Sequence, residues 1–528
     1  MKQNNIFKLM LMGAGLLFLN ACTDLVPVEN PIDETIDNQG TRIEVLGLRT
    51  ETDTKVTLTG TDFAWKEGDK IAVWTGTDAE HYGNYGGFQE CTVAADGSLP
   101  VALAAGYARY NYALYPANII YAGGKANFTR TGLMVILPDT YSYDDVCDDN
   151  VQQPMIAVND KTQSTLMFYN LASMLRLTVT VPQGTVKVRV KFNPACQVNG
   201  EYYVGTNINP VEVGTSCIDS SQVYSPSNVI SITGVHDIPV SGAITVNIPI
   251  PVGSTGYNDF SVSAWDSDDK ALKGEIVHLA SNYNATRGHG KQISVTLTQG
   301  AFQANTYNHV TSYCIFSPAN LMYDGTKITF HSHDYDVCGS PTYSETGTFD
   351  KFAWGTSGYN DRVPWGTTYA PQGDIQSSKF DWGVYNVINS YKVRTWITPS
   401  SADWTAIKNN HTFATGTIGG VQGLIILPYA YAGPEIKKGR LVNYSENNLS
   451  IDDWTPIKNA GAVFLPYAKD AKDYYWSSYS KSDGNEKAYC LYTGTGSYGE
   501  TAYYTMQVGE QDFTKKSSRL YVRLINYL

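Results

Sequence analysis

The side chains that could bind a metal or attack a substrate are scattered along this chain. The densest group is His331-Ser332-His333-Asp334, whose two histidines would share one face of a strand, as two zinc ligands could. A histidine pair on a surface strand accounts for the same pattern, and no Cys-x-x-Cys or Cys/His spacing typical of zinc sites occurs. We therefore expect no metal site and no cofactor.

Catalytic motifs are missing in the same way. The sequence contains no Gly-x-Ser-x-Gly elbow, no His-Glu-x-x-His helix and no phosphate-binding loop. No nucleophile, base and orienting partner can be assembled from neighbouring residues. We expect no catalytic residues and no enzyme activity, with a secreted enzyme as the least favoured alternative.

Residues 1–22 form a targeting segment. An apolar run over Leu9–Leu19 is too short to cross a bilayer, which needs ~20 residues. The run leads into Leu19-Asn20-Ala21-Cys22, which resembles the lipobox of bacterial lipoproteins, although an ordinary signal peptide with a chance cysteine is possible. We expect acylation of Cys22 to anchor the protein in a membrane, and residues 23–42 to form a tether.

The composition of the whole 528-residue chain limits the partners that it can have. The net charge of −12 argues against a nucleic-acid partner, because phosphate binding needs a basic surface. Seven of the eight cysteines follow Cys22, so at least one of these is unpaired if no other chain is involved. Cys196 with Cys217, and Cys314 with Cys338, are near enough in sequence to pair.

Between residues 43 and 300 the chain reads as short strands separated by turn residues. Apolar and polar residues alternate as they do in half-buried strands. This alternation is found in Leu171–Val181, Thr185–Phe192, Ala243–Val252 and Gln292–Leu297, and two further short strands are expected at Ile43–Leu48 and Ile71–Trp74. Strands at this spacing favour two successive antiparallel β-sandwiches.

Three motifs in this part resemble those of the fimbrillin-like proteins of Bacteroidales. They are Phe63–Trp74 (FAWKEGDKIAVW), Pro154–Ala157 and Phe168–Leu177, in the order of that family. The resemblance implies two tandem transthyretin-like β-sandwich domains, over residues 43–164 and 165–300. Physically, the expected core anchors around a turn are Phe63, Trp65, Ile71 and Val73.

Residues 305–528 have a different character, with seven of the ten Trp and 23 of the 38 Tyr. Their motifs resemble the C-terminal modules of Bacteroidales surface proteins with a C-type-lectin-like α+β fold. These motifs are Phe352–Asn360, Asp381–Asn386, Gly423–Pro428, Gly461–Pro466, Tyr475–Ser478 and Tyr521–Arg523. Each motif could be purely architectural. The resemblance implies ligand binding, for which we predict the aromatic residues Trp354, Tyr359, Trp365 and Trp382.

The same resemblance does not extend to known activities of that fold. Sugar-binding members hold calcium with Glu-Pro-Asn and Trp-Asn-Asp motifs, whereas this chain has Gly433-Pro434-Glu435 and Trp476-Ser477-Ser478. The formylglycine-generating enzymes use paired or copper-binding thiols, whereas Cys490 is alone late in this module.

The module also contains an internal echo. Asp403–Asn409 (DWTAIKN) recurs as Asp453–Asn459 (DWTPIKN). Ser400 with Asp403 three residues later predicts a helix N-terminus, with Trp404 and Ile407 on one face of the helix.

Two functions from different classes fit these expectations. The first is a subunit at the tip of a pilus, which accepts a strand from another pilin and binds a host or bacterial surface glycan or protein. In pili of the family it resembles, proteolysis after an arginine removes the first strand, and we predict cleavage after Arg49, in a polar loop following Ile43–Leu48. Arg42 is the competing site. The second is a surface lipoprotein that binds glycan or protein without polymerising. Either protein would lie at the outer membrane or cell surface, anchored by lipid, and the pilin would move into the fimbrium after processing.

Overall fold

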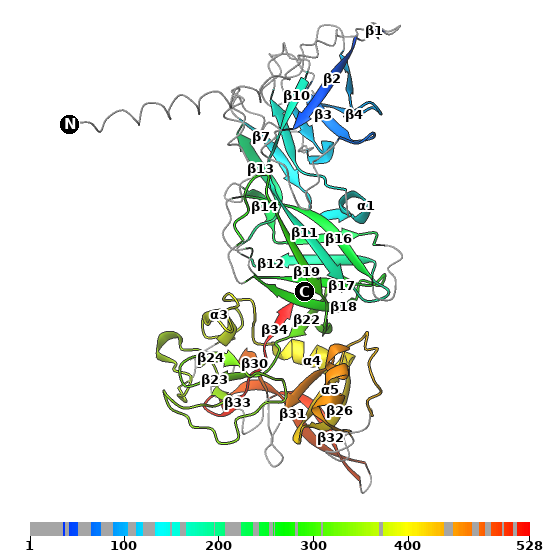
Figure 1. Ribbon diagram of the computed structural model, residues 1–528. Helices are drawn as coiled ribbons and strands as arrows, with labels where there is room; N and C mark the ends of the chain where they lie inside the picture. The colour runs from blue at the N-terminus through cyan, green and yellow to red at the C-terminus, as the bar shows by residue number, and fades with distance from the viewer. Residues whose placement is uncertain are drawn as a thin grey trace, which may run out of the picture.

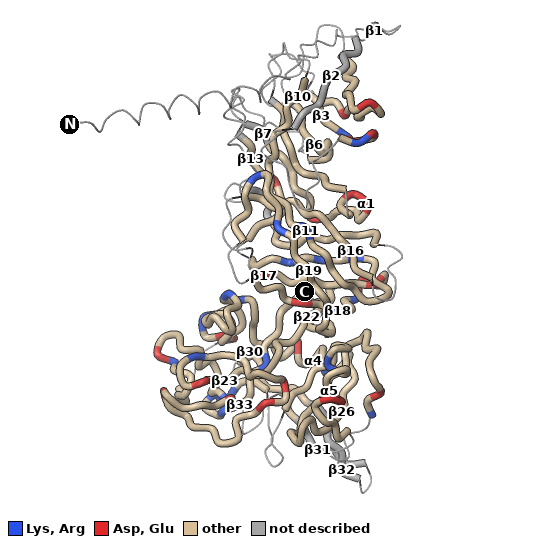
Figure 2. Tube along the Cα trace, in the orientation of Figure 1, with Lys and Arg blue, Asp and Glu red and all other residues tan. Residues whose placement is uncertain are grey.

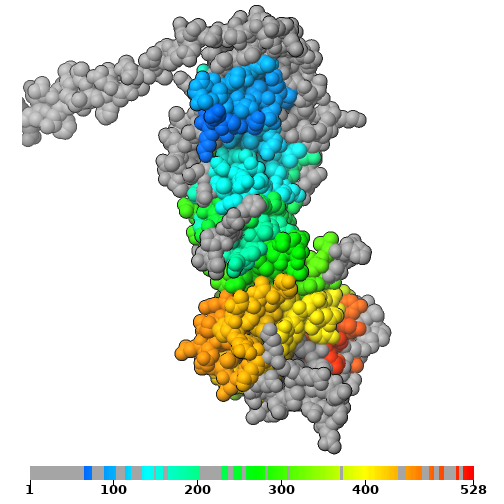
Figure 3. All heavy atoms as spheres, turned by 90° about the vertical axis from the view of Figure 1, so that its right-hand side faces the viewer, coloured from blue at the N-terminus to red at the C-terminus, as the bar shows by residue number. Residues whose placement is uncertain are grey.

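The computed structural model describes most of the chain from Trp65 onward and the backbone of two earlier strands. The described residues are 35–36, 42–50, 65–74, 88–103, 112–119, 132–147, 150–158, 165–194, 196–205, 223–235, 242–252, 257, 259–279, 283–307, 310–368, 373–437, 447–466, 475–480, 487–498, 501–509 and 515–528. They are mostly β-structure, as predicted. An N-terminal sheet, a second β unit and a C-terminal module follow one another along an elongated molecule (Figures 1 and 3).

The N-terminal sheet has eight strands, in the order β1-β2-β10-β9-β6-β3-β4, with β5 also paired to β2. Its strands are β1 (Thr35–Ile36), β2 (Arg42–Thr50), β3 (Lys70–Trp74), β4 (Phe88–Thr92), β5 (Leu99–Leu103), β6 (Tyr112–Tyr115), β9 (Met155–Val158) and β10 (Thr165–Asn170). A 3-10 turn, Ala117–Ile119, follows β6. Trp65 packs edge-on against Tyr115 and Phe168 beside the buried Ile71 and Val73, so these three predicted core anchors are confirmed. Phe63 lies outside the described residues.

The second unit has two sheets that share one core. One sheet is β16-β11-β19 and the other is β20-β18-β17-β12-β15-β8. The strands are β8 (Thr140–Ser142), β11 (Ser173–Thr180), β12 (Lys187–Phe192), β15 (Val229–Thr233), β16 (Ala243–Ile250), β17 (Asp259–Trp265), β18 (Ala271–His278), β19 (Gly290–Thr296) and β20 (Gln299–Gly300), with the short helix α1 (Tyr143–Val146). Leu177 and Val246 from the first sheet and Val190 and Val262 from the second lie in one buried cluster.

The boundary predicted at residue 164 is wrong. β10 begins at Thr165 but pairs with β2 and β9 of the N-terminal sheet. A third small sheet, made of β7 (Gly132–Leu137), β13 (Asn199–Gly205) and β14 (Val223–Ser227), joins strands from both sides of that boundary. The first two units are therefore interwoven in sequence.

The sheets are also mixed rather than purely antiparallel. β2 runs parallel to β10, β11 to β19, and β8 to β15. Parallel pairs arise where a connection crosses between sheets instead of turning back as a hairpin. Alternation within a strand predicts which face is buried but carries no information about the direction of its neighbour.

The C-terminal module has short sheets and two capped helices, α4 (Ser401–Asn410) and α5 (Ile451–Asn459), besides the short helix α3 (Trp382–Tyr385) and the 3-10 turn Tyr359–Asp361. Its strands are β21 (Phe302–Tyr307), β22 (Val310–Phe316), β23 (Leu321–Tyr323), β24 (Ile328–Phe330), β25 (Lys351–Ala353), β26 (Thr412–Ile418), β27 (Val421–Leu427), β28 (Asn447–Leu449), β29 (Val463–Pro466), β30 (Tyr475–Ser480), β31 (Ala488–Tyr498), β32 (Thr501–Gly509), β33 (Arg519–Tyr521) and β34 (Ile525–Tyr527). The main sheet is β25-β33-β30-β31-β32, and β28-β26-β27-β29 forms a second.

The predicted helix at Ser400 is confirmed. Ser400 accepts a hydrogen bond from the backbone N–H of Asp403, and the Asp403 carboxylate accepts one in return from the backbone N–H of Ser400. Trp404 and Ile407 are both 0% exposed. The second copy of the echo forms α5 with an equivalent capping box, so the repeated sequence specifies a repeated local structure.

The second unit and the C-terminal module share a core. Trp265 and Ile276 of the second unit belong to the same buried cluster as Trp354 and Leu528 of the module. Charged residues of both signs are interspersed along the described trace (Figure 2). The shared cluster gives the junction an apolar core.

Candidate functional site

Strand β2 pairs with both β5 and β10 in the N-terminal sheet. Its residues 42–46 pair antiparallel with β5, and its residues 47–50 pair parallel with β10. The short strand β1 pairs with the beginning of β2. Removing β2 would leave unpaired backbone groups on both β5 and β10, and such an edge favours pairing with another strand.

The apolar surface beside β2 is fully buried. Two side chains of β5 and two of β10 are 0% exposed and belong to one core cluster: Leu99, Val101, Leu166 and Phe168. Burial of each contributes ~1.5–3 kcal/mol. Loss of β2 would thus leave a backbone edge next to this apolar cluster, and these are the two features that a strand-addition site uses.

Arg49 lies in β2 and not in a loop, so that part of the prediction is wrong. Its register partner is Met167 of β10, and the strand continues to Thr50. Polar residues extend the strand here because β10 supplies backbone partners. Residues 51–54 of the predicted loop and the predicted acylation site, Cys22, lie outside the described residues. Cleavage after Arg49 would require the end of β2 to separate from β10.

Strand β34, by contrast, is built into the junction between the second unit and the module. It pairs with β22, and Ile525 exchanges two backbone hydrogen bonds with Ile397, each 2.9 Å. The Tyr527 hydroxyl donates to the Asp403 carboxylate at 2.7 Å, and Leu528 is only 8% exposed. Figure 1 shows the C-terminus at this junction. These contacts would all have to break before this segment could join another subunit.

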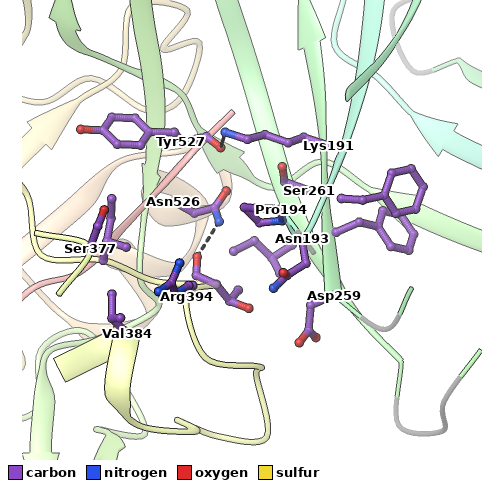
Figure 4. A pocket seen from close by; sticks show the side chains of 15 residues that line it. Lys191, Asn193, Pro194, Asp259, Ser261, Ser377, Val384, Arg394, Asn526 and Tyr527 are labelled. Atoms are coloured by element: carbon purple, nitrogen blue, oxygen red, sulfur yellow. Dashed lines mark hydrogen bonds between the residues drawn. The ribbon is translucent and has the colours of Figure 1, made fainter. Parts of the chain in front are cut away.

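A cavity of about 210 Å³ lies at the same junction, lined by residues of both units (Figure 4). Lys191 and Asp259 come from the second unit, and Arg394 and Asn526 come from the module. The Lys191 ammonium donates to the carbonyl of Tyr527 at 2.8 Å, and burial lowers the pKa of Lys191 to about 8. The cavity has room for several water molecules or a small polar ligand. The hydrogen bond that Lys191 donates at this cavity attaches β34 to the second unit.

The prediction of ligand binding is wrong for two of the four aromatic residues. Trp354 and Trp382 are 0% exposed and lie in the core of the module. The indole N–H of Trp354 donates to the carbonyl of Ser477 at 2.9 Å, and that of Trp382 donates to the carbonyl of Thr356 at 3.1 Å. Each tryptophan therefore fills the core with its ring, Trp354 is bonded to strand β30 and Trp382 to the segment after β25, and neither can reach a ligand.

The other two, Tyr359 and Trp365, are only partly buried. Tyr359 packs edge-on against Tyr385, which is 42% exposed, and the Lys379 ammonium lies 5.3 Å from the centre of the Tyr359 ring. We name Tyr359, Lys379 and Tyr385 the tyrosine patch. Trp365 packs against the core cluster, with its ring 5.5 Å from that of Tyr323. Aromatic faces beside a cation suit a sugar ring or a protein side chain.

The histidine pair does not lie on a surface strand, so this prediction is wrong as well. β24 ends at Phe330, His331 is 8% exposed, and its ring contacts the Asp350 carboxylate. His333 is exposed and contacts Asp336 instead. Cys314 and Cys338 are both free thiols, so the suggested pairing of these two is also wrong, and Cys217 lies outside the described residues.

Sequence reasoning missed Tyr385, Lys379 and the strands that flank β2. Tyr385 stands in the quoted motif Asp381–Asn386, so the motif itself was the available signal. The pairing of β2 with both β5 and β10 had no local signal, because register between distant strands depends on tertiary packing.

Comparison with solved structures gives neighbours among surface proteins of Bacteroides. A candidate cell adhesion protein of Bacteroides ovatus is 15% identical with a TM-score of 0.30, covering 48% of this chain and 91% of its own. A candidate cell adhesion protein of Bacteroides fragilis is 13% identical with a TM-score of 0.24, covering 51% and 96%. A candidate adhesin of Bacteroides ovatus is 10% identical with a TM-score of 0.24, covering 51% and 91%.

At these identities and TM-scores, the neighbours do not establish the fold or the function of this chain. No protein-family model and no curated protein matches it. Among the described residues, no helix combines the length and the apolar character needed to cross a membrane.

Proposed function

We propose that this chain is a fimbrial surface subunit at the tip of a pilus, which accepts a donor strand in place of β2 and binds a ligand through its C-terminal module. The observation that carries the proposal is the pairing of β2 with β5 on one part and with β10 on the other, beside four fully buried side chains. A replacement strand would run antiparallel to β5 and parallel to β10, as β2 does.

The state of β34 supports a tip position in particular. A subunit inside a filament must both accept a strand and donate one. Here β34 is fixed by β22, by Ile397 and by Lys191, so its release would disrupt the junction. A subunit that accepts a strand but keeps β34 in its own fold suits the end of the filament.

The rest of the proposal follows the resemblance of the sequence. The first two units would be transthyretin-like β-sandwiches, and residues 305–528 a C-type-lectin-like module whose tyrosine patch and Trp365 face a surface glycan or protein. Acylation of Cys22 would hold the chain at the outer membrane until processing after Arg49 transfers it to the fimbrium. The chain would have no enzymatic activity, and its partners would be other pilin subunits.

One observation favours the alternative of a surface lipoprotein that binds glycan or protein without polymerising. Arg49 is paired with β10, and a residue held in a sheet is a poorer protease site than one in a loop. In that alternative β2 stays in place and the chain keeps its lipid anchor.

The two functions are separated by arginine-specific proteolysis followed by strand replacement. The purified full chain would be digested under native conditions and then mixed with a synthetic peptide of residues 42–50. We expect cutting after Arg49 to lower the melting temperature of the N-terminal sheet and the peptide to restore it. A scrambled peptide of the same composition and the Arg49→Gln variant are the matched controls. Resistance of Arg49 to cleavage, or a peptide without effect, would support the alternative.

A further inference from the structure

Three side chains of different donor types converge in the C-terminal module. The ring of His331, the thiol of Cys338 and the carboxylate of Asp350 place one ligand atom each within 4.8 Å of one another. His331 follows β24 directly and Asp350 precedes β25 directly, so both ends of one connecting segment meet here. Cys338 lies between them in that segment.

Burial makes this cluster costly without a cation. Asp350 is 2% exposed and His331 is 8% exposed. The Asp350 carboxylate accepts the backbone N–H of Cys338 at 2.8 Å, and it lies 3.3 Å from the ring Nε2 of His331. A buried carboxylate is stable only when its charge is well compensated, and one long contact to a histidine is weak compensation.

We propose that His331, Cys338 and Asp350 bind one Zn²⁺ ion. Imidazole nitrogen, thiolate sulfur and carboxylate oxygen are the ligands that zinc prefers, and a thiolate and a carboxylate together cancel its two positive charges. The thiol proton passes to solvent when the zinc–sulfur bond forms. The three side chains leave a fourth position for water.

The distances suit this assignment after a small adjustment. Zinc–ligand bonds of ~2.0–2.3 Å place donor atoms of a tetrahedral site roughly 3.5 Å apart. The contact between His331 and Asp350, at 3.3 Å, already has this spacing. The widest separation, within 4.8 Å, has to close by about an ångström.

Bound zinc would join the two ends of the segment 331–350, which contains no helix or strand. Irregular segments of this length are uncommon in a compact unit unless they are functional or tied together. Asp334 in the same segment accepts the indole N–H of Trp454 at 3.2 Å and pairs with Lys458, both on α5. Zinc binding to this segment would therefore stabilise the attachment of α5.

The test is zinc titration of the full chain after chelator treatment, with heat-denaturation and cobalt spectra as readouts. We expect one equivalent to bind, with a rise in the melting temperature of the module on the order of 5 °C when zinc is ~100-fold above its Kd. The Cys338→Ser and His331→Gln variants should lose both effects. His333→Gln, which changes the exposed histidine of the same segment, should keep them.

Cobalt gives an answer that does not depend on a variant folding correctly. Co²⁺ bound to the unaltered chain should show a thiolate-to-metal charge-transfer band in the near ultraviolet, and added Zn²⁺ should remove it. Absence of the band, or zinc binding that survives both Cys338→Ser and His331→Gln, would overturn the proposal.

Discussion

At the scale of single residues, the internal echo offers two aspartates with the same sequence position but different surroundings. Asp453 is exposed and caps α5. Asp403 caps α4 but is 0% exposed, and it also accepts the backbone N–H of Asn305 at 3.0 Å and the hydroxyl of Tyr527 at 2.7 Å. The same carboxylate thus holds a helix, β21 and β34 at once.

We therefore expect Asp403→Ala to destabilise the module far more than Asp453→Ala does. Loss of Asp403 leaves buried donors unsatisfied and should cost about 3 kcal/mol, whereas Asp453→Ala removes only a solvent-exposed cap. Urea unfolding of the full chain, followed by tryptophan fluorescence, measures both. Equal losses for the two variants would mean that Asp403 does not link β34 to α4.

Single residues also show where sequence reasoning succeeds and where it fails. Ser400 and Asp403 were predictable because a cap depends on residues three apart in the chain. Trp354 and Trp382 were mispredicted because an aromatic side chain packs equally well in a core and against a ligand. Only tertiary structure, here their full burial, decides between these environments.

At the scale of elements, His411 connects the end of α4 to β21. Its Nε2 accepts the backbone N–H of Gln303 at 2.7 Å, and burial lowers the pKa of His411 to about 4, from an ordinary 6.5. The unfolded chain therefore binds this proton before the folded chain does as the pH falls. The stability that His411 contributes is present above pH 6.5 and is lost as the pH falls towards 4.

This loss should be on the order of 2–3 kcal/mol for the module. We expect His411→Gln, which keeps an acceptor but cannot titrate, to unfold with a weaker acid dependence between about pH 7 and pH 4.5. Denaturant unfolding at the two pH values measures it, and His333→Gln is the matched control because that histidine is exposed. An unchanged acid dependence in His411→Gln would assign the effect to other groups.

A strand or helix was predictable where the residues that specify it are neighbours in the sequence. The strands predicted at Ile71–Trp74, Thr185–Phe192 and Ala243–Val252 correspond to β3, β12 and β16. The direction of pairing was not predictable, because β2, β11 and β8 each find a parallel partner far along the chain. The place of Arg49 in β2 was not predictable for the same reason, because its register partner, Met167 of β10, is far along the chain.

At the scale of the whole molecule, the shared core shifts the boundary of the C-terminal module. β21 begins at Phe302, and Phe302 and Ala304 are 0% exposed in the cluster that contains Trp404. A fragment of residues 305–528, the bounds predicted for the module, cuts this strand. Ala301, just before β21, belongs to the buried cluster that the second unit and the module share.

We expect a fragment of 299–528 to be more stable than one of 305–528, by roughly 3 kcal/mol or more, because the longer fragment keeps a buried phenylalanine. Chemical denaturation of both fragments, with the full chain as reference, measures the difference. Equal stabilities would show that β21 adds nothing to the core of the module.

Strand exchange at β2 is the central claim, and it is tested most directly by the N-terminal sequence of the chain recovered from assembled surface filaments. Our account predicts a mature chain that begins at Thr50, with β2 lost and another subunit's strand between β5 and β10. Membrane-bound precursor from the same cells should begin at the acylated Cys22. Filament protein that still begins at Cys22, or that begins at Ile43 with β2 retained, would contradict strand exchange at this site.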